Sequence, residues 1–137
     1  MNGFIDPDEL LARYITSSRW FRKQDQTVKQ DAFMPPEPPL GTPLELSVTR
    51  HVNFTEDDIW NIGRGIAIHA SRTLYGRADV KTAHVTAQRL SLESKPESDN
   101  PNHANIVGWP LDKDARKIRA LEIASVADFV ANPEGKI

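Results

Sequence analysis

Cysteine is absent from this 137-residue chain. Its absence excludes disulfide bonds, zinc ribbons, iron–sulfur sites and a cysteine nucleophile, so the fold has to be stabilised by packing. Long apolar runs are absent too: no stretch approaches the roughly 20 residues that span a membrane, and the first residues lack the features of a secretory signal. We therefore expect a cytoplasmic protein that does not act at a membrane.

An excess of charge of one sign is also lacking, because 17 basic and 19 acidic residues leave a formal net charge of -2. A dedicated nucleic-acid-binding protein usually carries a clear basic excess, so the net charge does not indicate a nucleic-acid partner. The hydrophobic share of 39% and the charged share of 26% are typical of a globular chain. We predict a single domain over residues 1–137.

Familiar catalytic motifs are missing as well. The sequence has no glycine-rich phosphate-binding loop, no G-x-S-x-G nucleophile elbow and no H-E-x-x-H zinc motif. Its 4 histidines are scattered along the chain, and no two of them have the helical spacing of metal ligands. We therefore predict no metal site and no cofactor.

The N-terminal region carries the signals of a helix. Asp6 followed by Pro7 and Glu9 is typical of a helix N-terminus, in which the aspartate caps and the glutamate completes a capping box. Apolar residues then recur at helical spacing from Leu10 onwards. These patterns predict a helical arm over residues 1–30.

A proline-rich segment follows the predicted arm. Half of the 10 prolines lie within residues 35–43, and proline both restricts the backbone and removes an amide donor. We predict an extended strap over residues 31–43 whose first end is pinned by burial of Phe33. A ligand for an SH3-like or WW-like domain is the alternative interpretation of this segment.

The predicted core covers residues 44–130, and residues 131–137 are left as a tail. Its elements are a strand over 44–52, a helix over 55–70, a long strand that bends near 88–89, a strand over 103–109 and a helix over 111–130. Inside the first of these helices, Gly63 and Gly65 predict close approach of a neighbouring element. The predicted class is α+β, with a mostly antiparallel three- to four-stranded sheet packed by two or three helices.

Polar residues gather at the edges of the predicted strands. Arginine binds phosphate or carboxylate through its planar fork, and histidine acts as a general acid or base near neutral pH. His103 and Asn105 share one face of their predicted strand and are therefore able to meet at one ligand. Pairing of Arg77 with Asp79, and packing roles for the others, are the structural alternatives. The predicted ligand-binding residues are Arg50, Arg77, Asp79, Asn105 and Trp109, with His103 as the candidate catalytic acid or base.

The second half of the last predicted helix is apolar over a wide face. Such a face is either buried in the core or left for a partner. We predict that it forms an interface with a protein partner or with a second copy of the chain. The residues assigned to this interface are Ile118, Leu121, Ile123 and Val126.

Several strings of the sequence resemble those of a family of small, uncharacterised bacterial proteins. They are AFMP at residues 32–35, RAD at residues 77–79 and, most distinctive, HANIVGWP at residues 103–110. The resemblance covers about residues 21–127. It implies a bacterial source and a single compact unit, and it attaches no activity to the chain.

Two hypotheses about function follow. The first is a non-catalytic binding or assembly module that acts through a protein partner or a homodimer. The second is a small hydrolase or transferase for a phosphate-bearing small molecule, such as a nucleotide, or for an RNA end. In the second, Arg50 and Arg77 hold the anion, His103 moves the proton, and Asp79 and Asn105 orient them.

Overall fold

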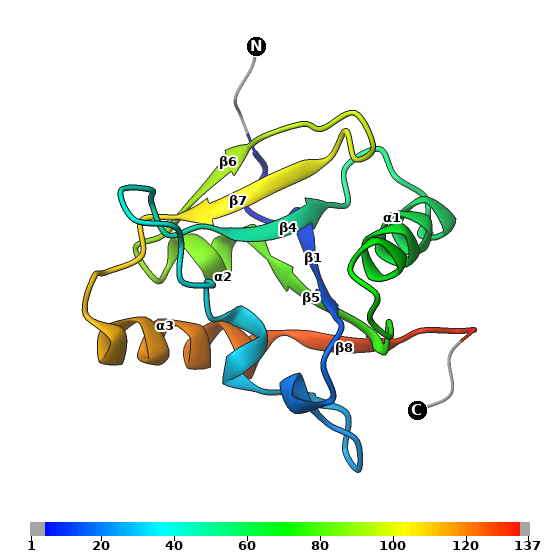
Figure 1. The fold of residues 1–137 in the computed structure, drawn as a ribbon, viewed down its shortest axis with the longest axis horizontal. Coiled ribbons are helices and arrows are strands. Elements are labelled where there is room, and N and C mark those ends of the chain that lie inside the picture. Colours follow the sequence, from blue (N-terminus) through cyan, green and yellow to red (C-terminus); the bar gives the residue numbers. More distant parts are fainter. Residues whose placement is uncertain (1–4, 135–137) are drawn as a thin grey trace.

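The computed structural model describes residues 5–134 of the chain. Six strands form one sheet in the order β6-β7-β4-β1-β5-β8, and two further strands form a separate β2-β3 hairpin. All neighbouring strands are antiparallel. Figure 1 shows the sheet between α3 on one side and α1 on the other. In chain order the elements are β1 (Leu10–Ile15), η1 (Ser18–Trp20), β2 (Phe21–Arg22), β3 (Thr27–Val28), η2 (Gln30–Phe33), β4 (Leu46–Arg50), α1 (Glu56–His69), β5 (Gly76–Lys81), α2 (Thr82–Thr86), β6 (Ser91–Ser94), β7 (His103–Val107), α3 (Lys113–Val126) and β8 (Asp128–Ala131).

The predicted α+β class is confirmed, but the predicted count of three to four strands is too low. Four strands, β1, β2, β3 and β8, lie in segments that were predicted as helical. Two more, β5 and β6, lie in the segment that was predicted as one bent strand. The error at β1 arises because a short apolar segment buried on both sides lacks the alternation that separates strand from helix, whereas β8 is a partly exposed edge strand.

The predicted N-terminal helix is wrong, since residues Leu10–Ile15 form the central strand β1. The capping signal at Asp6 produces only a local turn, in which the Asp6 carboxylate accepts a hydrogen bond from the Asp8 amide at 2.8 Å. Leu11 faces the core on one side of the sheet and Tyr14 faces the core on the other. Burial on both faces produces the apolar run that resembles a helix.

The predicted long strand is interrupted by a short helix. The strand β5 ends at Lys81, and α2 follows at once, with Val85 fully buried in the core. The strand β6 begins only at Ser91. The change of buried face near residues 88–89, predicted as a bulge, marks the exit from this helix.

The last predicted helix is also too long. The helix α3 ends at Val126, and the chain then enters the edge strand β8, which pairs with β5. Part of the apolar character assigned to the helix belongs to this strand, whose Phe129 stacks on Phe21 with ring centroids 4.7 Å apart. The predicted tail, residues 131–137, begins with Ala131 of β8 and ends outside the described residues.

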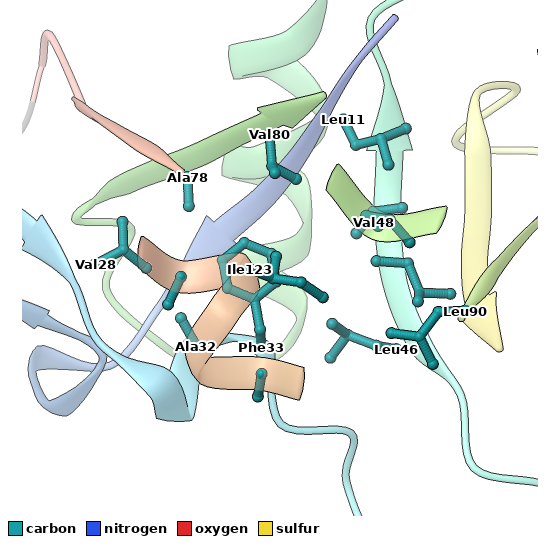
Figure 2. Packing of buried hydrophobic residues seen from close by; sticks show 14 of the residues in the cluster. Leu11, Val28, Ala32, Phe33, Leu46, Val48, Ala78, Val80, Leu90 and Ile123 are labelled. Carbon is teal, nitrogen blue, oxygen red and sulfur yellow. The ribbon is translucent and has the colours of Figure 1, made fainter. Parts of the chain in front are cut away.

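The main core lies between the sheet and the layer formed by α3, η2 and α2. Phe33 of η2 is fully buried and lies beside Ile123 of α3, close to the centre of the cluster (Figure 2). Burial of Phe33 is the predicted anchor of the strap and is confirmed. Farther along the strap, Glu37 forms an ion pair with Arg116 of α3 at 3.4 Å.

A second, smaller core lies between β1 and α1. The helix begins with the capping box expected at Thr55, in which Thr55 and Asp58 each bind the other's backbone amide. Its Gly63 lies against the ring of Tyr14, so the predicted close approach is confirmed at this glycine. No atom lies near the corresponding position of Gly65. Among the described residues, no helix is both long and apolar enough to cross a membrane.

Candidate functional site

Arg77 and Asp79 form a buried ionic cluster on the α1 side of β5. Arg77 is only 3% exposed, and its Nε donates to the Asp79 carboxylate at 2.9 Å. Its Nη1 and Nη2 each donate to a Glu56 oxygen at 3.0 Å, and the guanidinium lies 4.7 Å from the ring centroid of Trp60. Two carboxylates therefore take up the guanidinium fork, as in the structural alternative of an Arg77–Asp79 pair.

The charge of this cluster is stabilised by its hydrogen bonds. Burial alone lowers the pKa of Arg77, but the hydrogen bonds to Glu56 and Asp79 outweigh it and raise the pKa above its ordinary value. The Nε2 of His51 lies 3.1 Å from the Asp79 carboxylate and extends the cluster to the end of β4. The cluster ties β5, α1 and the loop after β4 together.

Arg50 is held by a separate ion pair at the end of β4. Its Nε and Nη2 donate to the two carboxylate oxygens of Glu9 at 2.7 and 2.9 Å. This hydrogen bonding raises the pKa of Arg50 above its ordinary value. Arg50 shares the parity of the buried Leu46 and Val48, whereas Arg77 projects from the opposite face of the sheet. The two arginines do not face one ligand.

His103 lies several strands away from the ionic cluster. The strand register places His103 beside Thr49, Thr49 beside Ala12, and Ala12 beside Asp79. At about 4.8 Å per strand, this separates His103 from Asp79 by about 14 Å. The predicted clamp of Arg50, Arg77 and His103 is therefore not assembled in the fold.

The other residues predicted for the ligand site have structural contacts. Asn105 is buried and accepts a hydrogen bond from the Ser47 hydroxyl at 3.4 Å. Trp109 is buried in the main core, where its indole Nε1 donates to the Ile106 carbonyl at 2.9 Å. Both side chains therefore have packing roles, which the sequence left open as alternatives.

Three of the four residues predicted for the interface have exposed side chains on α3. Ile118 is 63% exposed and Leu121 is 51% exposed, and Val126 is exposed as well. Ile123 is fully buried and packs beside Phe33 (Figure 2), so its side chain is not available to a partner. The prediction for Ile123 is corrected accordingly, because this residue faces the sheet.

Sequence reasoning missed two arginines that line a cavity with His103. Arg13 of β1 and Arg72, which follows α1, border a cavity of about 210 Å³. A signal for Arg13 was present, since it is the only charged residue within the apolar run LLARYI of residues 10–15. Arg72 carried no such signal, because it reaches the cavity only through the packing of α1 against the sheet.

Comparison with known proteins assigns no function to these residues. No protein-family model, curated protein sequence or solved structure matches the chain. Within residues 5–134, no three metal-ligating side chains come together. The candidate sites therefore remain the outer side of α3 and the cavity between Arg13, Arg72 and His103.

Proposed function

We propose that this chain is a cytoplasmic, non-catalytic assembly module that forms a parallel homodimer through α3. The supporting observation is the exposed apolar pair Ile118 and Leu121 on the outer side of a helix whose inner side is fully packed. Large apolar side chains exposed next to each other are typical of interaction surfaces. The separation of Arg50, Arg77 and His103 also favours a module over the phosphate-processing enzyme.

The spacing on α3 fits a short parallel helix pair. Ile118 and Leu121 have the spacing of a and d positions in a heptad, and Lys117 and Glu122 then take the flanking g and e positions. A β-branched residue at a with leucine at d favours a two-stranded pair. In this arrangement the two apolar residues of each protomer pack against those of its partner.

Charge complementarity supports a second copy of the chain as the occupant. In a parallel pair, a g residue faces the e residue of the partner, so Lys117 faces Glu122 of the partner subunit, and the contact occurs twice by symmetry. Within the described part of the chain, neither Lys117 nor Glu122 forms an ion pair with another residue. Both charged side chains are therefore available to form ion pairs with the partner subunit.

Sedimentation analysis of charge-reversed variants tests this proposal. We expect the wild-type chain to dimerise with increasing concentration, and we expect Lys117→Glu and Glu122→Lys each to weaken the dimer. Mixing the two single variants restores opposite charges at both contacts, so a heterodimer forms. Lys113→Glu is the control, because it makes the same charge change at an exposed position outside the apolar pair.

The homodimer is wrong if the wild-type chain stays monomeric at the highest soluble concentration. It is also wrong if Lys113→Glu weakens the dimer as much as Lys117→Glu. A dimer that persists in both single variants places the contact on another surface. All variants change exposed residues, so circular dichroism is expected to show an unchanged fold.

A further inference from the structure

The cavity beside Arg13 lies where two central strands separate. The strand β1 pairs with β5 along its whole length but with β4 only at Leu11–Arg50 and Ala12–Thr49. Figure 1 shows β4 crossing β1 at a steep angle. Residues from both sides of the sheet line the resulting opening, which we name the Arg13 cavity. Its lining includes Arg13, Arg72, Thr16, Thr49, Trp20 and His103.

Arg13 is held firmly at this cavity without a carboxylate. Its Nε donates to the Ala32 carbonyl at 2.8 Å and its Nη1 to the Ser47 carbonyl at 3.2 Å, while the guanidinium lies 5.0 Å from the ring centroid of Trp20. Within residues 5–134, Nη2 has no hydrogen-bond acceptor. The protein therefore positions the guanidinium and leaves its positive charge uncompensated.

A second positive charge lies close to the first. Arg72 lines the same cavity. Burial, together with the nearby charge of Arg72, lowers the pKa of Arg13 from its ordinary value to about 10. Asp31 lines an adjoining hollow with Arg72. Among the described residues, no carboxylate forms an ion pair with either arginine. An anion in the cavity relieves both the repulsion and the lost hydration.

We propose that the Arg13 cavity binds the phosphate group of a small phosphate monoester. Such a group carries a charge of about -1.5 to -2 at neutral pH, which matches two guanidinium groups, whereas a single carboxylate leaves one of them uncompensated. The hydroxyl of Thr16 supplies a further donor. The Thr49 hydroxyl is buried and accepts a hydrogen bond from Asn100 at 2.9 Å, so it belongs to the wall of the cavity.

The rest of the ligand lies in the groove that adjoins the cavity. This groove encloses about 570 Å³ between α1 and the ends of β4 and β7, and it shares His103 and Ile66 with the cavity. Its lining also includes Glu97, whose carboxylate lies 3.7 Å from the Nδ1 of His103, and Asp99. These carboxylates accept hydrogen bonds from hydroxyl groups and repel a second anion, so the groove suits a polyhydroxyl compound with one phosphate and disfavours a polyanion.

This site is independent of the proposed homodimer, because no residue of α3 lines the cavity or the groove. Isothermal titration calorimetry with ribose 5-phosphate, inorganic phosphate, ribose and acetate tests it. We expect ribose 5-phosphate to bind more tightly than inorganic phosphate, and ribose and acetate to bind far more weakly. Arg72 is exposed and supports no other side chain, so Arg72→Gln leaves the fold intact.

We expect Arg72→Gln to weaken ribose 5-phosphate binding about tenfold or more, the loss typical of one charge-assisted contact. Arg22→Gln, the matched control, changes an exposed arginine of β2 and leaves the affinity unchanged. Absence of phosphate binding, or an equal loss in both variants, overturns the site. Acetate binding as tight as phosphate binding overturns the choice of a dianion. Equal affinity for phosphate and ribose 5-phosphate overturns the place of the sugar in the groove.

Discussion

Gly63 of α1 lies so close to Tyr14 of β1 that a Cβ atom at position 63 meets the Tyr14 ring at 2.6 Å. The ring has little freedom to move away, because its hydroxyl donates to the Ile59 carbonyl at 2.6 Å and the side chain is buried. The closest contact between α1 and the central strand therefore depends on the absence of a side chain at this position. The walls of the Arg13 cavity depend on the same packing.

Gly63→Ala is expected to destabilise the protein. Overpacking a fixed ring costs about 1–3 kcal/mol, which exceeds the gain of about 1 kcal/mol in helix propensity. Gly65→Ala is the matched control in the same helix, since no atom lies within 4 Å of its added carbon. It is expected to raise the free energy of unfolding by about 1 kcal/mol. Urea denaturation of both variants checks the expectation, and a gain in stability for both would contradict the packing.

Phe33→Ala is expected to lower the free energy of unfolding by about 3–5 kcal/mol, because it leaves a cavity beside Ile123. Leu40→Ala changes a fully exposed residue in the middle of the proline-rich strap. It is expected to change the stability by less than about 0.5 kcal/mol. Thermal denaturation of the two variants shows whether the strap is anchored at its first end. Similar losses for both would place the anchor elsewhere.

Asp79→Ala is expected to cost about 3–5 kcal/mol, because it removes the buried carboxylate that compensates Arg77. The other carboxylate of the cluster belongs to Glu56, whose side chain is 66% exposed. Its replacement in Glu56→Gln is expected to cost about 1 kcal/mol or less, since water screens that pair. Chemical denaturation at neutral pH distinguishes the two. A larger loss for Glu56→Gln would show that the exposed pair dominates the cluster.

Tyr14 makes the free energy of unfolding depend on pH in the alkaline range. Burial raises the pKa of its hydroxyl in the folded protein, whereas the unfolded chain ionises near about pH 10. The folded state therefore binds more protons above that pH, and its stability falls as the pH rises. Between about pH 8 and about pH 10.5, the wild-type chain is expected to lose about 0.8 kcal/mol more than Tyr14→Phe. Urea denaturation at the two pH values measures the difference, and parallel losses would contradict it.

Local signals in the sequence were sufficient for some elements, although the capping signal at Asp6 produced only a turn. The capping box at Thr55 depends on residues three positions apart, and it forms as predicted. The strand predicted over residues 103–109 has polar residues at 103 and 105 between apolar ones, and it forms as β7 over His103–Val107. The α+β class and the burial of Phe33 follow from similar patterns.

Tertiary structure decided the elements whose patterns are ambiguous. The run from Leu10 to Ile15 fits a helix or a strand equally well, and only burial between two layers selects the strand β1. The same choice at β8 shortened the last helix, and the helix α2 replaced the middle of a predicted strand. The strands that pair with β1 and β8 lie far from them in the sequence.

For the candidate sites, too, some features follow from the sequence and others only from the tertiary structure. Residue types alone predicted that arginine and histidine carry the ligand chemistry, and the exposed pair Ile118 and Leu121 was visible in the helical pattern of the sequence. Which arginine is neutralised depended on the fold, because Glu9 and Glu56 reach Arg50 and Arg77 only across strand and helix contacts. Arg13 donates instead to the carbonyls of Ala32 and Ser47, and the described residues give it no ion pair with a carboxylate. The sequence determined which charges are present, and the tertiary structure determined which of them are compensated, because an ion pair depends on distance in space.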